Sequence, residues 1–125
     1  MSLENSIQVS VRCEYLADQS IAEEQRYVFA YHINIHNRGE QGATLRTRHW
    51  FIANGNADVQ EVKGEGVVGE QPTIEPGETY RYSSGSVLST LVGSMRGYYV
   101  MEADDGTLFH ATIPVFTLAV PNALN

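Results

Sequence analysis

The chain has few of the residues and segments that mark several common classes of protein. It contains one cysteine, Cys13, in 125 residues, so it cannot form a disulfide within itself, as is usual in a reducing compartment. No segment approaches the ~18 consecutive apolar residues of a membrane-spanning helix, and the N-terminus has no apolar run of signal-peptide length. These absences predict a soluble, cytoplasmic protein without a membrane partner.

Positive charge is also scarce. Eight Lys and Arg stand against fifteen Asp and Glu, which gives a net charge of −7. This balance opposes general attraction to nucleic acid and to anionic membrane surfaces. All the cations but Lys63 are arginines, whose planar guanidinium suits carboxylate and phosphate. Arg48, Arg81 and Arg96 lie in expected strands and are our candidate anion contacts.

Apolar and polar residues alternate over much of the chain, which is the pattern of half-buried β-strands. In residues 7–15 the odd positions are apolar, so we expect Cys13 to point inward as a small buried hydrophobe rather than a reactive thiol. Within 44–54 the alternation breaks, which predicts either burial on both faces or a bulge near Arg46 to Arg48. We expect both arginines on one face, where they would form surface ion pairs or contact an anion. The remaining expected strands are 26–36, 58–63, 79–87, 93–103 and 108–118.

These strands define the expected fold. About seven short strands separated by turns, with no amphipathic helix of normal length, predict an all-β antiparallel sandwich of the fibronectin type III or immunoglobulin kind. Residues 18–25 are expected to form a loop or one short helical turn. Pro76-Gly77 followed by Tyr80 matches a corner between two sheets, with the Tyr80 hydroxyl bonding back to the preceding backbone. The chain shows no repeat or linker, so we expect one domain, residues 1–125.

One stretch, Gly64-Glu65-Gly66-Val67-Val68-Gly69, matches the phosphate-binding pattern G-x-G-x-x-G. That motif requires a helix after it, which Pro72 and Pro76 exclude, so we do not expect a dinucleotide fold. Two interpretations remain. Backbone N–H groups around Gly64, Gly66 and Gly69 form an anion-binding nest for pyrophosphate or a nucleotide, or the glycines only permit bends and close strand approach.

Neither a catalytic site nor a metal site is predicted. The sequence lacks a G-x-S-x-G nucleophile elbow, and Ser83-Ser84-Gly85 has no base beside it in the sequence. His32 and His36 would share one face of a strand, but they stand about 13 Å apart, too far to hold one ion. His49 and His110 are isolated. We therefore expect no enzyme activity and no cofactor.

Several motifs in combination resemble the bacterial ApaG family. They are Tyr27-Val28-Phe29-Ala30-Tyr31, Arg48-His49-Trp50, the glycine motif with Glu70-Gln71-Pro72, Tyr82-Ser83-Ser84-Gly85, Gly93-Ser94-Met95-Arg96-Gly97 and Ile113-Pro114-Val115-Phe116. The resemblance covers nearly the whole chain. It departs at Leu91, where the family pattern usually has a proline, which affects only the conformation of the turn from Thr90 to Gly93.

The resemblance implies a fibronectin type III-like sandwich and offers no catalytic residues to carry over. Related domains in eukaryotic F-box proteins and in a polymerase-associated protein look like interaction modules. The family name comes from an operon that includes a diadenosine-tetraphosphate hydrolase, and members are often labelled as cobalt or magnesium efflux proteins. Because no segment can span a bilayer, any link to cobalt and magnesium homeostasis is expected to be indirect.

The expected function is therefore a non-catalytic protein-interaction module with an unidentified protein partner. The alternative is a protein that binds a small anion, pyrophosphate or a nucleotide, through the loop from Gly64 to Gly69 with Arg48, Arg81 or Arg96.

Overall fold

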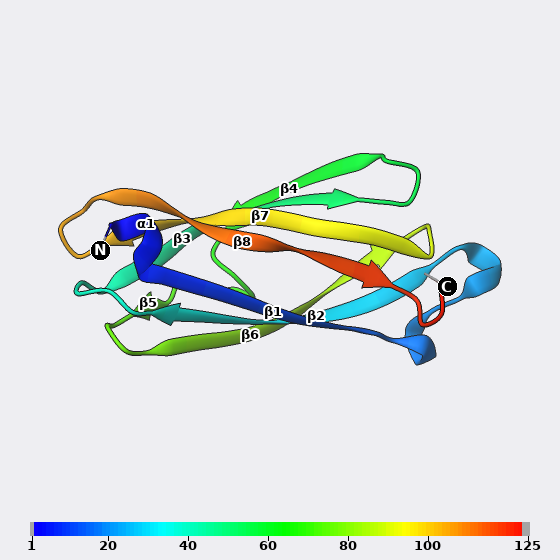
Figure 1. Cartoon of the computed structure of the whole chain (residues 1–125), viewed down its shortest axis with the longest axis horizontal. Helices are drawn as coiled ribbons and strands as arrows, with labels where there is room; N and C mark the ends of the chain where they lie inside the picture. The colour runs from blue at the N-terminus through cyan, green and yellow to red at the C-terminus, as the bar shows by residue number, and fades with distance from the viewer. Residues whose placement is uncertain (1, 124–125) are drawn as a thin grey trace.

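Two antiparallel sheets packed face to face make up the chain, which the computed structural model describes for residues 2–123 (Figure 1). The smaller sheet has the order β1-β2-β6; its strands are β1 (Ile7–Tyr15), β2 (Tyr27–Asn37) and β6 (Thr79–Leu88). The larger sheet has the order β4-β3-β7-β8, with β5 also paired to β3; its strands are β3 (Ala43–Ala53), β4 (Val59–Glu65), β5 (Thr73–Ile74), β7 (Val92–Ala103) and β8 (Leu108–Ala119). The predicted all-β antiparallel sandwich is confirmed.

The seven expected strands are all present, and their bounds differ from the prediction by no more than two residues. The eighth strand, β5, was not expected because two residues are too few to show alternation. The same holds for the four-residue helix α1 (Leu3–Ser6). The expected loop at 18–25 contains two short 3-10 turns, η1 (Ala17–Gln19) and η2 (Ala22–Glu24).

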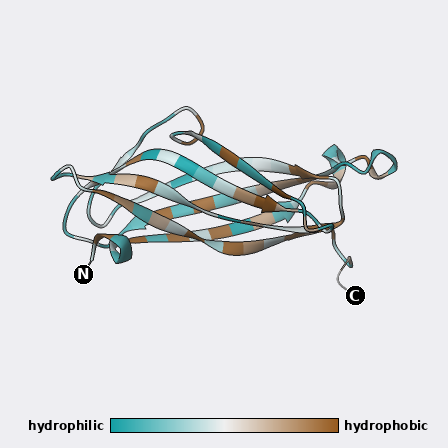
Figure 2. Ribbon diagram, turned by 90° about the horizontal axis from the view of Figure 1, so that it is seen from above, coloured by the Kyte–Doolittle hydropathy of each residue, from teal (hydrophilic) through white to brown (hydrophobic). Residues whose placement is uncertain are grey.

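The alternating residues of the strands form the core between the sheets. Figure 2 shows hydrophilic and hydrophobic residues alternating along the ribbons. On β2, Ile33 and Ile35 are at most 1% exposed, and Tyr31 packs with Trp50 and Phe116 at ring-centroid distances of 5.4 and 6.0 Å. Cys13 packs against this core, as predicted, and donates its S–H to a backbone carbonyl of β8. Burial raises the pKa of its thiol, so it has little thiolate character.

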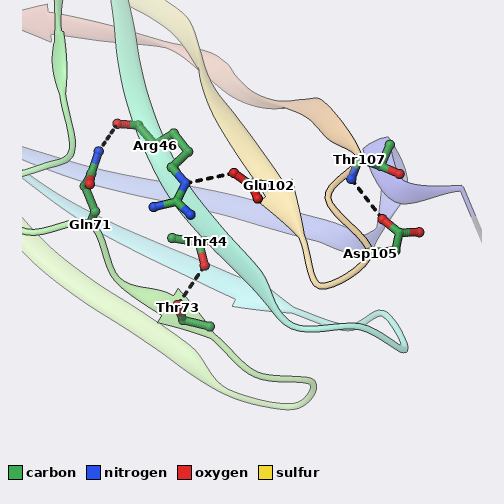
Figure 3. Close-up of polar contacts among 7 residues, drawn as sticks. All are labelled: Thr44, Arg46, Gln71, Thr73, Glu102, Asp105 and Thr107. Atoms are coloured by element: carbon green, nitrogen blue, oxygen red, sulfur yellow. Dashed lines mark hydrogen bonds and ion pairs between the residues drawn. The ribbon is translucent and has the colours of Figure 1, made fainter.

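Of the two explanations for the broken alternation in β3, the bulge is confirmed, but its consequence differs from the expectation. The register between β3 and β7 shifts between Leu45 and Thr47. The extra residue, Arg46, directs its Nε to Glu102 Oε1 at 3.1 Å on the outer face of the sheet (Figure 3). Arg48 pairs instead with Tyr99, whose side chain is 0% exposed on the inner face. The prediction that Arg46 and Arg48 share a face was therefore wrong, because the bulge inserts one residue into the alternation.

The sandwich is closed along one side and open along the other. Strands β1 and β8, the edges of the two sheets, lie side by side (Figure 1). On the opposite side the edge strands are β6 and β4, and within residues 2–123 β6 pairs with β2 alone. The three-stranded sheet leaves part of the inner face of the larger sheet uncovered on this open side.

The corner that was assigned to Tyr80 is held by a different residue. The Tyr80 hydroxyl donates to Glu70 Oε2 at 2.9 Å, and not to the preceding backbone. The crossing is fixed by Asn37, whose side chain is 0% exposed. Its amide joins three backbone segments: Nδ2 donates to Gln41 O and Ile74 O, and Oδ1 accepts from the N–H of Gly39.

Gly97 allows β3 and β7 to approach closely, since a Cβ at this position would overlap the carbonyl oxygen of His49. We predict that Gly97→Ala lowers the free energy of unfolding by about 2–3 kcal/mol, the upper part of the usual range for overpacking, because the clash is with backbone. At Gly77, which has φ of 85° and open space around the Cβ position, alanine meets only conformational strain of about 1 kcal/mol. Urea unfolding of both variants tests this ranking, and equal losses would contradict it.

Candidate functional site

A cleft of about 330 Å³ lies on the open side of the sandwich, between the free edges of β4 and β6. We call it the Arg48 cleft. Its walls come from the inner faces of both sheets and from the turn that follows β4, and they include Tyr31, Arg48, Trp50, Tyr82, Ser84 and Gly69. Its volume is at the lower end of the range for small-ligand pockets.

Arg48 is held in place by the glycine motif. Its Nη1 donates to the carbonyl oxygens of Glu65 and Gly66 at 3.0 and 2.9 Å. The guanidinium lies against the backbone of Gly64, where a Cβ would stand 2.6 Å from Arg48 Cζ. A glycine is therefore needed at residue 64 so that the cation can lie flat on β4.

The rest of the motif is a tight turn that closes on itself. Val67 and Glu70 exchange two backbone hydrogen bonds, at 2.8 and 2.9 Å, and the Gly66 N–H donates to Arg46 O. Gly66 has φ of 62°, and a Cβ there would overlap the carbonyl of Glu70. The turn inserts Val67, 1% exposed, into the core. These bonds show what the motif does structurally, and they use the N–H groups of Gly66, Val67 and Glu70.

Beneath the cleft, the hydroxyls of Tyr82 and Tyr99 are joined by a buried hydrogen bond. Burial raises the pKa of both phenols above the ordinary value, because the phenolate would lose its hydration. Both side chains are therefore neutral at physiological pH. Arg48 lies close enough to favour the phenolates slightly, although burial dominates.

Of the three candidate arginines, Arg48 lies beside the glycine motif and the other two do not. Arg81 is exposed beside Arg12 and Asn34 on the outer face of the smaller sheet. Arg96 lies over the ring of Phe51, with 5.0 Å between Cζ and the centroid. Strand alternation explains the difference, since Arg81 precedes the inward Tyr82 and Arg96 follows the inward Met95.

Cross-strand pairing brings together a Ser–His–Glu array that the sequence did not reveal. On the outer face of the smaller sheet, His32 Nδ1 lies 2.6 Å from Ser83 Oγ, and its Nε2 lies 3.3 Å from Glu14 Oε1. Only the register of β1, β2 and β6 could have indicated this array. The Glu14 side chain is 49% exposed, so its charge acts in a high dielectric and polarises the imidazole weakly. Cross-strand polar pairing explains the array without a catalytic role.

The other histidines form no metal cluster. His49 and His110 stack on opposite faces of Tyr98, at 4.5 and 4.3 Å between centroids. Burial lowers the pKa of His49, and the nearby Lys63 charge adds to this. Among residues 2–123, the structure contains no group of three or more His, Cys, Asp or Glu side chains placed to hold a metal ion. The helices described in this range are also too short to cross a membrane.

The model of the ApaG domain matches residues 17–103. The chain belongs to the ApaG family. It is 55% identical to protein ApaG of Pseudomonas putida strain W619 over 119 residues, which are 95% of this chain and 94% of that protein. Protein ApaG of Azoarcus sp. strain BH72 has the same identity and coverage.

A solved structure agrees with this assignment. The crystal structure of a Bordetella pertussis protein described as ApaA superposes with a TM-score of 0.90 at 45% identity, covering 94% of this chain and 95% of that one. The resemblance that the sequence motifs indicated is thus confirmed. The names of these relatives state no activity, so the chemistry of the site has to be argued from its own residues.

The buried Tyr82–Tyr99 hydrogen bond provides a test of the packing beneath the cleft. We expect Tyr82→Phe or Tyr99→Phe alone to cost about 1–3 kcal/mol, because each leaves one buried hydroxyl without its partner. The double variant should lose less than the sum of the two single losses, since it leaves neither hydroxyl. A double-mutant cycle measured by urea unfolding checks this, and additive losses would show that the pair is not coupled.

The same two phenols predict a pH dependence. Above about pH 10, tyrosines of the unfolded chain lose their protons, while Tyr82 and Tyr99 keep theirs because their native pKa is raised. The native state then binds more protons than the unfolded state, so stability falls as the pH rises. The double phenylalanine variant should show a shallower fall between about pH 9 and 11. Parallel slopes for the two proteins would contradict this assignment.

Proposed function

We propose that this ApaG-family chain is a non-catalytic protein-interaction module of the cytoplasm, which binds an extended segment of a partner along the free edge of β6. The observation that carries the proposal is the contrast between the two edges on the open side of the sandwich. Edge strands attract added strands unless charge, proline or a bulge protects them.

Strand β6 has none of these protections on its middle residues, Ser83-Ser84-Gly85-Ser86. Its register with β2 runs without a shift from Leu88 to Thr79. Strand β4, across the cleft, carries Glu61, Lys63 and Glu65 and is mostly exposed. Charge therefore protects the edge of β4 against strand addition. The backbone groups along the edge of β6 remain open to a partner strand, and strand addition is a common mode of peptide recognition.

An indirect link to cobalt and magnesium homeostasis, which the family resemblance implies, is part of the same proposal. The lack of a metal-ligand cluster in residues 2–123 supports an effect that passes through a protein partner. The exposed array of Ser83, His32 and Glu14 does not support an enzyme, because an efficient triad needs an oriented acid in a low-dielectric site.

The alternative, a small-anion binding protein that uses the loop from Gly64 to Gly69 for pyrophosphate or a nucleotide, has one supporting observation. Arg48 is fixed beside that loop. Against it, the N–H groups of Gly66, Val67 and Glu70 already have backbone partners. Neither Arg81 nor Arg96 contributes charge there.

The edge proposal is tested with Ser86→Lys, which places a cation on the inward side of β6, and with Ser10→Lys on the exposed face of β1 as a control for added charge. Immobilised wild-type protein and the Ser10→Lys variant should capture the same stoichiometric partner from lysate, and Ser86→Lys should capture at least ~10-fold less. In the purified complex, amide hydrogen exchange should slow along β6. Equal capture by both variants, or slowed amide exchange only in elements other than β6, would contradict the proposal.

A further inference from the structure

We propose that the Arg48 cleft is a carboxylate-binding site, and that the carboxylate is carried by the extended segment that pairs with β6. The carrier rests on the function proposed above. The carboxylate site rests on the cleft alone, so the two parts can fail separately.

The first observation is a set of hydrogen-bond donors that have no protein partner. Tyr31 and Trp50 line the cleft and are only 6% and 3% exposed. Within residues 2–123, neither the Tyr31 hydroxyl nor the Trp50 indole N–H makes a hydrogen bond, and the same is true of the Ser84 hydroxyl at the β6 wall. Among the buried side-chain nitrogens and oxygens of residues 2–123, His49 Nδ1 alone lacks a hydrogen-bond partner, so these three donors are open to the cleft and not sealed in the core. Three donors that line one cleft without protein partners offer hydrogen bonds to a ligand with acceptor oxygens.

The second observation is the part of Arg48 that is left open. Its two hydrogen bonds to the carbonyls of Glu65 and Gly66 both come from Nη1. Its Nε and Nη2, the two nitrogens of one edge of the guanidinium, have no partner within the described chain. This edge is the fork that binds the two oxygens of a carboxylate side by side. The glycine motif thus fixes the cation and leaves its recognition edge free.

The charge of the cleft selects among oxyanions. Arg48 is the one cation that lines it, Glu65 stands at its rim, and the chain carries a net charge of −7. A single positive charge matches a monoanion, whereas pyrophosphate or a nucleotide would bring several negative charges against Glu65. The second acidic group of the turn, Glu70, accepts a hydrogen bond from the Tyr80 hydroxyl.

The carrier follows from the position of the cleft beside β6. Tyr82 and Ser84 belong to the inward side of β6 and form one wall. A segment added to the free edge of β6 becomes the fourth strand of the smaller sheet, and its alternate side chains point at the uncovered inner face of β3 and β4. Arg48 lies on that face. An Asp or Glu at one inward position of the segment would place its carboxylate on the open guanidinium edge.

The test of the carboxylate site uses the full chain and follows the indole N–H signal of Trp50 by NMR, which is unambiguous because the chain has one tryptophan. The probes are sodium acetate, inorganic pyrophosphate, and sodium chloride at matched ionic strength. We expect acetate to shift the signal with half-saturation on the order of 10 mM, and chloride and pyrophosphate to shift it less. A larger saturable shift with pyrophosphate would overturn the carboxylate assignment in favour of the phosphate alternative.

Variants separate the guanidinium from general charge. Arg48→Gln should weaken acetate binding at least ~10-fold, and Tyr31→Phe about 3-fold. Arg81→Gln removes the same charge from the outer face and should leave the binding unchanged. Tyr31→Phe keeps the ring that packs on Trp50, so it tests the site even if Arg48→Gln fails to fold. Equal binding by wild type and Tyr31→Phe, or no saturable shift with acetate, would refute the site.

The carrier is tested with a capped pentapeptide, Val-Thr-Glu-Val-Thr, and its counterpart with Gln in place of Glu. The Glu peptide should bind at least ~10-fold more tightly than acetate and slow amide exchange along β6, and the Gln peptide should bind ~10-fold more weakly than the Glu peptide. If acetate binds and the Glu peptide binds no better, the carrier is wrong and the carboxylate site stands. Loss of edge pairing in Ser86→Lys with normal acetate binding would separate the two in the same way.

Discussion

The unequal width of the two sheets is the constraint on which the rest of this structure depends. A sheet of three strands cannot cover the inner face of a sheet of five. The contact between β1 and β8 closes one side, so the whole mismatch falls on the other side, between β6 and β4. Apolar residues left uncovered there would cost free energy in water. The chain meets this constraint with a tight turn that inserts Val67 and with a cation, Arg48, on an otherwise apolar face.

This constraint explains why a phosphate-binding pattern occurs in a protein whose fold cannot use it in the usual way. Gly64 is needed because Arg48 lies flat against it, and Gly66 is needed because the turn brings Glu70 too close for a side chain. The glycines therefore shape the backbone against which one arginine is held. The N–H groups of Gly66, Val67 and Glu70 have backbone partners in and beside the turn, so the proposed recognition rests on the guanidinium and on the donors of Tyr31, Trp50 and Ser84.

Two polar arrangements in the molecule illustrate how environment decides chemistry. The Ser83–His32–Glu14 array has the residue types of a hydrolytic triad, but it lies on a solvated sheet face where its charges are screened. The Arg48 cleft has no nucleophile aligned with a base, but hydrogen-bond donors line it and Arg48 is fixed by two carbonyl oxygens. Preorganised donors in a partly desolvated cleft favour binding. Together with the unprotected edge of β6, this arrangement supports the proposal of a binding role.

Much of the fold follows from local information, because side-chain direction in a strand depends only on sequence parity. Alternation located every strand of normal length, and the break in it located the bulge in β3. The two-residue β5 and the short α1 are too brief to carry a period. Asn37 continues the inward parity of β2, yet its three backbone partners come from segments that only the folded chain brings together.

The site was less accessible to such reasoning. The sequence by itself determined that the chain is an all-β sandwich that resembles the ApaG family and that the glycine motif does not precede a helix. It named Arg48, Arg81 and Arg96 equally as candidate anion contacts. Only the tertiary structure decided that the bulge turns Arg48 inward and that Arg81 and Arg96 lie elsewhere. It also decided that Tyr31, Trp50 and Ser84 line the same cleft as Arg48. The reason is physical: parity sets the face on which a side chain lies, whereas strand register and sheet packing set its neighbours.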